Sequence, residues 1–319
     1  MIKKRFGKKG MIFTIIAVLL VSVMISSTFF FTKDSYLKKS FVASSRISSM
    51  NDFILSVEQD MDRSMMISGY RTFISLQKQI ASNGSFLSDM DLAFSEVFIN
   101  GTLNGVSQDL MVNASINDWV LRINEESQKV NIIIYFTPNR ISVYHDSPWS
   151  VVVEIDGTLN VSDTTGLANW YFNKTFKRNF EIVSFEDPLY TVKSLDKVTN
   201  IIIKANSSDF VDELTNDTSE FYSHINSSRY VASEYAPSFL MRFEGNISAS
   251  EFGIESLVDL QEFSNQNMQI YERSIIDYQY FNENYNGSDK CNFPDTPSWV
   301  RIDENRVDDY EVTGLGVDC

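Results

Sequence analysis

The chain has 319 residues and a formal net charge of −15. This acidic balance argues against nucleic acid as a partner, because a negative surface repels phosphate groups. Hydrophobic residues make up 43% of the sequence and aromatic residues 13%, which excludes general disorder and suffices for one or two packed cores.

The first predicted element is an uncharged apolar run from Met11 to Phe31, directly behind a basic leader at residues 1–10. As a helix rising about 1.5 Å per residue, the run would reach about 31 Å, close to the thickness of the hydrocarbon core of a bilayer. A soluble helix is rarely apolar on every side over this length. We therefore predict that residues 11–31 form a transmembrane helix and that the chain binds the membrane through them.

The charges around the run predict its orientation. Five Lys or Arg residues precede it, whereas all 42 acidic residues follow Phe31, together with 22 of the 27 basic ones. The part beyond the run therefore has a net charge of −20, which is 22 minus 42. The positive-inside bias favours a cytoplasmic N-terminus and an extracellular C-terminal ectodomain on a single-pass protein of the cell membrane.

Ten acceptor motifs for N-glycosylation, Asn-x-Ser/Thr without Pro in the middle position, all lie beyond the apolar run. They begin at Asn83, Asn100, Asn113, Asn160, Asn173, Asn206, Asn216, Asn226, Asn246 and Asn286. This is roughly twice the number that chance would produce from the Asn, Ser and Thr content. The excess favours a glycosylated surface protein, and the alternative is a set of accidental matches in a chain rich in Asn and Ser.

Cys291 and Cys319 are the only two cysteines of the chain. Outside the cell a disulfide between them is expected and would add roughly 3–4 kcal/mol in the chain-entropy model, and the alternative is two free thiols. Secreted animal glycoproteins usually carry many disulfides. Abundant acceptor motifs with few cysteines therefore point to an archaeal surface.

The leader is similar to a known processing signal. Lys8-Lys9-Gly10 followed by Met11-Ile12-Phe13-Thr14-Ile15 resembles the class III signal sequence of archaeal type IV pilin-like proteins, over about 30 of the 319 residues. The resemblance implies a dedicated peptidase that cuts between Gly10 and Met11 and leaves the apolar helix as the new N-terminus. Many type IV pilins carry Glu five residues past the cut, where this chain has Ile15. That departure concerns packing into a filament more than anchoring in a membrane.

Two other interpretations of the N-terminus stay open. An uncut signal-anchor needs only the charge bias and the apolar length, and both are present. A conventional secretory signal cut near Ser26-Ser27 is the weaker interpretation, because the apolar run continues through Phe31 and contains no Ala-x-Ala site.

Residues 32–128 are predicted to form a helical stalk and packing helices. Apolar residues recur at steps of three or four on one face of a long amphipathic helix, at Ile47, Met50, Ile54, Val57, Met61 and Met65. A second helix is predicted from Phe86 to Ile99, ending at Asn100-Gly101, and a third from Asn117, which would cap it, to Gln128.

The hydrophobic period then changes to two, which predicts an antiparallel four-stranded sheet over residues 129–187. The first strand would end in a tight turn at Pro138-Asn139, and a return strand would follow it. The third and longest strand would run over residues 149–162, straight through Gly157, and the fourth over residues 170–182. One face of this meander is apolar, and the preceding helices are available to cover it.

Residues 188–319 are predicted to form a C-terminal α+β lobe, with a short strand at Asn200–Lys204 and a helix within Asp209–Asn226. The predicted fold class is therefore α+β: a transmembrane helix extended into a long amphipathic helix, an antiparallel meander and a second lobe. A helix followed by a meander is pilin-like in outline, and it also occurs in unrelated α+β domains.

No motif in the sequence carries chemistry, so no catalytic residue, cofactor or metal is predicted. The histidines, His145 and His224, are expected in core or surface roles. Carboxylates gather near the end, at Asp303, Glu304, Asp308, Asp309 and Glu311, but their spacing does not match a calcium-binding EF-hand loop.

We interpret the chain as a membrane-anchored, N-glycosylated extracellular protein with a structural role in pilin-like assembly or in adhesion, and with other copies of itself as filament partners. It is not predicted to be an enzyme. The alternatives are a sensor or receptor ectodomain and, less favoured, a membrane-tethered enzyme. A deep pocket with converging polar groups would favour the enzyme, whereas a flat sheet with an exposed helix would favour the structural subunit.

Overall fold

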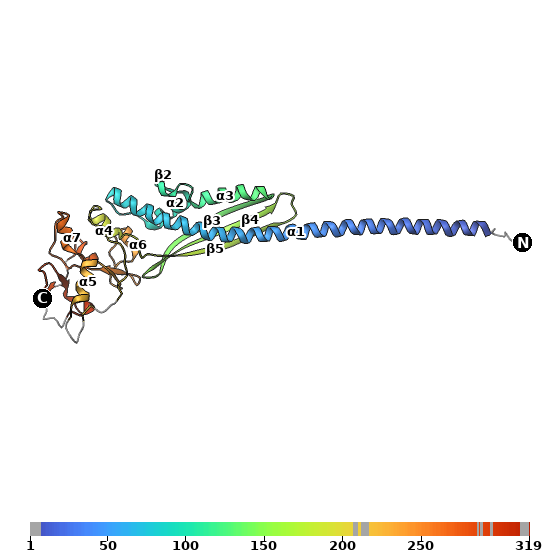
Figure 1. Ribbon diagram of the computed structural model, residues 1–319. Helices are drawn as coiled ribbons and strands as arrows, with labels where there is room; N and C mark the ends of the chain where they lie inside the picture. The colour runs from blue at the N-terminus through green and yellow to red at the C-terminus, as the bar shows by residue number, and fades with distance from the viewer. Residues whose placement is uncertain are drawn as a thin grey trace.

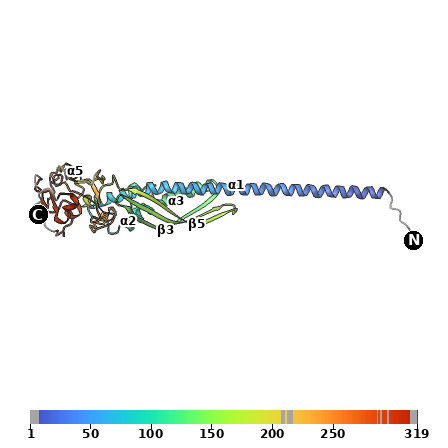
Figure 2. The same cartoon turned by 90° about the horizontal axis from the view of Figure 1, so that it is seen from below.

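The structure is a computed structural model that describes residues 8–206, 210–211, 217–285, 287, 290–293, 296–312 and 319, with the backbone alone at 8–11 and 31–39. The molecule is elongated, and its two termini lie at opposite ends (Figure 1). One helix, α1 (Lys8–Asn83), joins the predicted apolar helix and the predicted amphipathic helix into a single element of 76 residues. Its N-terminal part stands free of the rest of the chain in both views (Figures 1 and 2).

The C-terminal part of α1 is held by a stripe of buried apolar side chains. Met50, Ile54, Val57, Met61 and Met65 are all buried, as their helical spacing predicts. Ile47 does not belong to this stripe, since 44% of it is exposed. At this turn of α1 the neighbouring Arg46 makes the contacts with the end of the sheet.

Two shorter helices follow α1, and their caps decide where they begin. Helix α2 (Met90–Asn100) starts after Asp89, whose carboxylate accepts the Leu92 N–H, and it ends at Gly101 with φ of 71°. Helix α3 (Ile116–Lys129) is capped by Ser115 in a capping box with Asp118. The predicted cap at Asn117 is therefore wrong, because Ser115, two residues earlier, accepts the Asp118 N–H and caps the helix instead.

Small elements connect these helices. They are β1 (Thr102–Leu103), β2 (Val106–Ser107) and the 3-10 helix η1 (Asp109–Met111), and β1 and β2 pair antiparallel.

The sheet contains three strands, in the order β3 (Ile132–Ser147), β4 (Ser150–Asp163) and β5 (Asn169–Glu181), all antiparallel. The predicted first and second strands are one strand, because β3 continues through Pro138-Asn139 with a shift of register instead of turning there, whereas the predicted third and fourth strands are β4 and β5. Proline is tolerated at this point because β3 is an edge strand and a bulge absorbs the missing N–H. The turn that was expected at Pro138 lies between Ser147 and Ser150.

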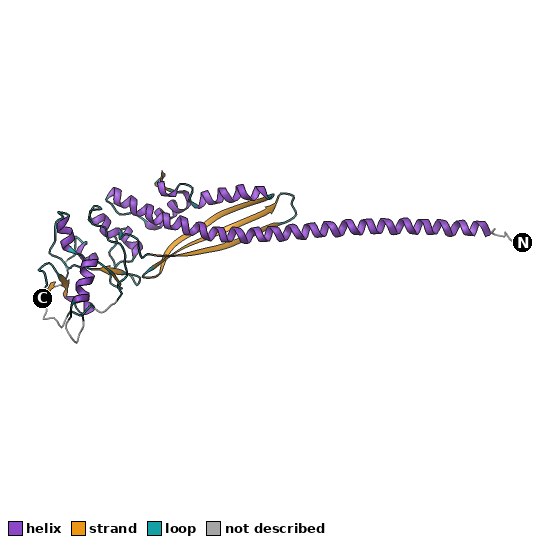
Figure 3. Cartoon of the chain, in the orientation of Figure 1, coloured by secondary structure: helices purple, strands orange, loops and turns teal. Residues whose placement is uncertain are grey.

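Strand β4 passes straight through Gly157, as predicted, and the glycine makes room for an aromatic ring. A Cβ atom at Gly157 would lie 2.2 Å from Cε2 of Phe136 on β3. The alternation of β4 buries Val151, Val153, Ile155 and their odd-numbered successors on one face. Helix α1 packs on this face at β4 and β5, and α2 and α3 pack at β3 (Figure 3).

The main core lies between these helices and the sheet. Phe73 of α1 is its centre, with the rings of Phe94, Phe180 and Phe185 at centroid distances of 4.9, 5.9 and 5.5 Å. Trp119 of α3 packs edge-on against Phe136 and donates a 2.8 Å hydrogen bond from Nε1 to the Asp60 carboxylate on α1. A buried indole N–H thus has its partner.

The C-terminal lobe, at the end opposite to the free helix, has its own core. Its helices are α4 (Pro188–Lys193), α5 (Ser219–Ser227), α6 (Phe239–Phe243), α7 (Leu260–Asn265), α8 (Asp277–Tyr280), η2 (Glu304–Arg306) and η3 (Asp308–Tyr310). Its strands form two antiparallel pairs, β6 (Tyr230–Ala232) with β7 (Ile254–Ser256) and β8 (Lys290–Asn292) with β9 (Arg301–Asp303). The mixed α+β class is thereby confirmed.

Two predictions within this lobe need correction. The strand expected at Asn200–Lys204 is reduced to isolated bridges, because Ile201 and Lys204 each pair at one position with a different segment, at Glu186 and Tyr230. The helix expected within Asp209–Asn226 falls partly outside the described residues. In the described part, helix α5 covers Ser219–Ser227.

Candidate functional site

The free part of α1 is the most exposed apolar element among the described residues. Ile12–Phe30 is long and apolar enough to cross a membrane, and none of it is buried within the chain. The hydroxyl groups of Ser22, Ser27 and Thr28 donate to backbone carbonyl groups three residues earlier, at 2.8 to 2.9 Å. These polar side chains are therefore satisfied without water. A helix of this kind at the N-terminus fits a membrane anchor or a signal sequence.

Four groups, which we call the Arg46 clamp, hold α1 to the nearest end of the sheet. The guanidinium of Arg46 donates from Nε to the Asp163 carboxylate at 2.8 Å, and from Nη2 to the carbonyl groups of Val130 and Asn131 at 2.7 and 2.8 Å. Asp163 also accepts the hydroxyl and the backbone N–H of Thr165. The clamp sets the position along α1 where the helix leaves the domain.

The hydrogen bonds of the clamp favour the charged form of the Asp163 carboxylate. The Thr165 hydroxyl and then the Arg46 guanidinium hold the pKa of Asp163 at about 2, below its ordinary value. An apolar hollow lined by Val42, Ala43 and Leu167 lies next to it.

Among the described residues no helix packs on the second face of the sheet, and we call it the open face. Apart from Ile133 and the buried Val152, its residues are mostly polar or aromatic and include the exposed Tyr135, Tyr144 and Tyr171. The hydroxyl of Tyr144 donates to the Glu154 carboxylate at 2.9 Å, and the ammonium of Lys177 lies 2.7 Å from it. The hydrogen bond from Lys177 is the main reason that the pKa of Glu154 is lowered.

Further along the open face, hydrogen bonds link all three strands. Asn139 Nδ2 donates to the Thr158 hydroxyl at 2.9 Å, and this hydroxyl donates to Asn173 Oδ1 at 2.8 Å. The face thus presents amides, hydroxyl groups, aromatic rings and the ion pair of Glu154 with Lys177. Such a surface can stack and hydrogen-bond against another surface.

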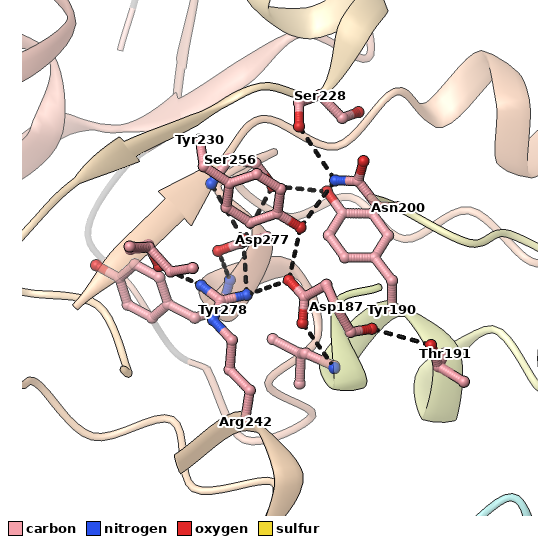
Figure 4. A network of polar contacts seen from close by, with 12 residues as sticks. Asp187, Tyr190, Thr191, Asn200, Ser228, Tyr230, Arg242, Ser256, Asp277 and Tyr278 are labelled. Atoms are coloured by element: carbon pink, nitrogen blue, oxygen red, sulfur yellow. Dashed lines mark hydrogen bonds and ion pairs between the residues drawn. The ribbon is translucent and has the colours of Figure 1, made fainter. Parts of the chain in front are cut away.

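The C-terminal lobe is built around a buried network of charges (Figure 4). Arg242 of α6 donates from Nη1 to Asp187 at 2.6 Å and to Asp277 at 3.0 Å, and all three side chains are completely buried. The Tyr230 hydroxyl donates to Asp187 at 2.6 Å. The Ser256 hydroxyl donates to Asp277 at 3.0 Å. The network therefore joins α4, α6, α8, β6 and β7.

Two carboxylates share one guanidinium in this network. Burial changes the pKa values of one of these carboxylates and of the neighbouring tyrosines. Burial raises the pKa of Asp277 to about 6, even though Arg242 opposes the shift. Burial also raises the pKa values of Tyr190 and Tyr230 well above their ordinary value. Because no member reaches solvent, we assign the network to the assembly of the lobe and not to catalysis.

A second ionic cluster lies beside the first. Arg306 pairs with the buried Glu255 and, at 2.5 Å, with Asp309, and it donates to the Tyr278 hydroxyl at 2.7 Å. The Tyr310 hydroxyl donates to Glu255 at 2.8 Å. This cluster connects η2 and η3 to β7.

The sequence analysis did not single out these network residues. Asp187 followed by Pro188 is a recognisable helix start, with an N-cap carboxylate and proline in the first turn, and α4 begins there. Arg242 and Asp277 carry no comparable local signal. Their roles depend on contacts with residues 35 to 55 positions away.

Other carboxylates and the histidines also serve the local structure. Glu96 lies in the groove between α1 and α2, where the N–H groups of Gly105 and Asn104 and the hydroxyl of Thr102 bind it and lower its pKa. His145 is half-buried and accepts the Leu240 N–H at 3.3 Å. His224 is buried against the ring of Phe210.

The acidic residues near the end are likewise engaged within the lobe. Asp303 accepts the Tyr285 hydroxyl and the Asn305 N–H, and Glu311 accepts the Phe210 N–H. Within the described part of the chain, no group of three or more His, Cys, Asp or Glu side chains could hold a metal ion.

The structure describes eight of the ten glycosylation motifs, and Asn216 and Asn286 lie outside the described residues. Seven of the eight asparagines are exposed: Asn83, Asn100, Asn113, Asn173, Asn206, Asn226 and Asn246. The eighth, Asn160, is half-buried on the open face.

The remaining residues singled out in the sequence lie at the two ends of the molecule. Cys291 of β8 and Cys319 form a disulfide. Gly10 and Met11, the residues of the expected processing site, lie in the first turn of α1.

The chain matches no protein-family model, no characterised protein and no solved structure. Its functional interpretation therefore rests on its own residues: the free helix, the Arg46 clamp and the open face.

Proposed function

We propose that this chain is a single-pass, N-glycosylated surface protein whose ectodomain serves pilin-like assembly or adhesion. The observation that carries the proposal is the division of α1. Its first part, Ile12–Phe30, is apolar and unburied among the described residues, and its second part is the spine of a folded domain. An element that is at once anchor and core fixes the domain rigidly to the bilayer.

Charge supports the orientation. The basic residues of the leader remain inside, and the part beyond Phe31, with its net charge of −20 from 22 basic and 42 acidic residues, lies outside together with the glycosylation motifs. The resemblance of the leader to class III signals supports processing between Gly10 and Met11.

The surfaces favour a structural role over an enzymatic one. The open face pairs Glu154 with Lys177 and links its amides and hydroxyl groups by hydrogen bonds across the strands. The buried charges of the C-terminal lobe are closed to solutes. A domain of this kind is suited to contacts between surfaces.

The test is mass spectrometry of the mature protein from native membranes, combined with protease treatment of intact cells. We expect an N-terminus at Met11, a mass above that of the polypeptide, and digestion of the ectodomain from outside. Gly10→Leu should block the cut, whereas the matched control Gly7→Leu in the same leader should leave it unchanged.

Each other result points to a different conclusion. An N-terminus at Met1 would show an uncut signal-anchor and remove the pilin-like processing. An N-terminus near Thr28, with the protein lost from the membrane, would show a cleaved secretory signal. Protection from external protease until the cells are lysed would reverse the orientation.

A further inference from the structure

One glycosylation motif differs from the others in its surroundings. Asn160 lies on the central strand β4, directly opposite Tyr135 of β3 on one side and Tyr171 of β5 on the other. All three side chains point to the open face, and the two tyrosines are 61% and 73% exposed. An acceptor asparagine thus stands in a row between two exposed aromatic rings.

The fold makes no hydrogen bond to the side-chain oxygen of Asn160. Its Oδ1 atom is buried without a hydrogen-bond partner. Elsewhere on the open face the polar side chains form hydrogen bonds across the strands, as Thr158 does with Asn173. A buried amide oxygen without a partner is uncommon in a folded protein and calls for an explanation.

The chemistry of a linked sugar fits this row. Side chains directly opposite on neighbouring strands have Cβ atoms about 4.5–5.5 Å apart, so a group attached to Asn160 would leave the sheet between the two rings. A pyranose has an apolar C–H face that can cover a tyrosine ring.

We propose that Asn160 carries an N-linked glycan whose first sugar packs between Tyr135 and Tyr171. The first sugar then forms part of the open face. This inference rests on the proposed function, because Asn160 must reach the side of the membrane where glycans are attached.

Asn173 provides the contrast on the same face. Thr158 lies directly opposite it, and the Thr158 hydroxyl already binds its Oδ1 atom. A glycan on Asn173 would have no ring opposite it and would extend into solvent.

The first measurement is glycopeptide mass spectrometry of the full-length protein from its native membranes. We expect the peptide that contains Asn160 to be modified. If Asn160 is bare while exposed acceptors such as Asn113 and Asn246 are modified, this inference is wrong and the proposed function stands. If every acceptor is bare, the proposed glycosylated surface protein is wrong as well.

The second measurement tests the packing through a double-mutant cycle, with the full chain purified in detergent and its thermal unfolding followed by tryptophan fluorescence. Ser162→Ala removes the acceptor motif and keeps Asn160. We expect it to lower Tm by about 2–4 °C, the size of shift that loss of ring contacts would cause in a domain of this size. In the Tyr135→Thr/Tyr171→Thr background, the same substitution should change Tm by less than about 1 °C.

The matched control is Ser248→Ala, which removes the motif of the exposed Asn246 and should leave Tm unchanged. Protein made in a host without N-glycosylation should show no effect of Ser162→Ala. An equal loss of Tm in both tyrosine backgrounds, or the same loss without any glycan, would overturn the packing of the sugar on the rings.

Discussion

Arg46 and Asp163 lie 117 positions apart in the sequence and 2.8 Å apart in the structure. Arg46 is on the helix that leaves the domain, and Asp163 is the last residue of the central strand. The same guanidinium also binds two carbonyl groups at the entry to β3. This side chain therefore helps to fix the direction in which α1 leaves the domain.

Acid should weaken the clamp. The pKa of Asp163 is about 2 in the folded chain and about 3.9 in an unfolded one, so its carboxylate stabilises the fold above pH 4 and this contribution is lost as the pH falls towards 2. We expect Asp163→Asn to lower Tm at pH 6 and to have little effect at pH 2.

The matched variant is Arg46→Gln, measured by the same thermal melts. It keeps the bond from Thr165, so part of the pH dependence should persist. A difference in Tm between Asp163→Asn and the wild type that stays constant from pH 6 to pH 2 would contradict the assigned role of the carboxylate.

Gly69 lets α1 approach the sheet closely. A Cβ atom at this position would lie 2.3 Å from Cζ of Phe180 on β5. Gly69→Ala should destabilise the domain by about 1–2 kcal/mol in urea unfolding, because overpacking outweighs the better helix propensity of Ala. Ser56→Ala, on the exposed side of α1, is the control and should be nearly neutral.

The shorter side chain in Phe180→Leu should relieve this overpacking. The double variant Gly69→Ala/Phe180→Leu should therefore lose less stability than the sum of the two single variants. Simple additivity would show that the ring of Phe180 is not what limits the approach of α1.

Removing Arg242 should leave two carboxylates buried without their cation. We expect Arg242→Met to cost about 3–5 kcal/mol, measured by urea unfolding at neutral pH. Adding Asp187→Asn and Asp277→Asn to this variant should recover part of the loss, since no uncompensated charge then remains. A loss that the two added substitutions do not reduce would point to packing rather than charge.

The same network predicts a pH effect of opposite sign to that of the clamp. Because the pKa of Asp277 is raised to about 6, the folded chain binds a proton more tightly at this site than the unfolded chain does. Lowering the pH from 7 to 5 should therefore add stability through Asp277. Asp277→Asn should remove this increase, and Tm measured from pH 7 to pH 5 would show it.

The disulfide should stabilise the lobe more than the sheet. Cys291 and Cys319 are separated by 28 positions, and closing a loop of this size is worth roughly 3–4 kcal/mol in the chain-entropy model. After reduction, or in Cys291→Ser/Cys319→Ser, limited proteolysis should begin in the C-terminal lobe. First cuts within β3, β4 or β5 would show that the two cores do not open separately.

Some parts of the fold followed from short-range pattern alone. The apolar run, the stripe from Met50 to Met65 and the alternation of β4 are local regularities, and each one forms the element that its period predicts. Gly101 ends α2 because its backbone adopts the left-handed conformation, which glycine accepts without strain.

Other parts depended on contacts with residues that are far away in the sequence. Pro138 predicts a turn by itself, but it lies in an edge strand whose hydrogen-bond partner β4 continues past it. Ile47 continues the spacing of the stripe in the sequence, but in the structure the neighbouring Arg46 makes the contacts with the end of the sheet, and Ile47 is 44% exposed.

The sequence by itself determined which segments could enter a membrane, which faces would be apolar and where glycans could be attached, because each of these depends on residue type and local period. Only the tertiary structure decided what meets across the chain: Arg46 with Asp163, Arg242 with its two carboxylates, and Asn160 with a tyrosine on either side. The physical reason is that these groups gain their roles from burial and from partners tens to more than a hundred residues away, and neither is set by the neighbouring sequence.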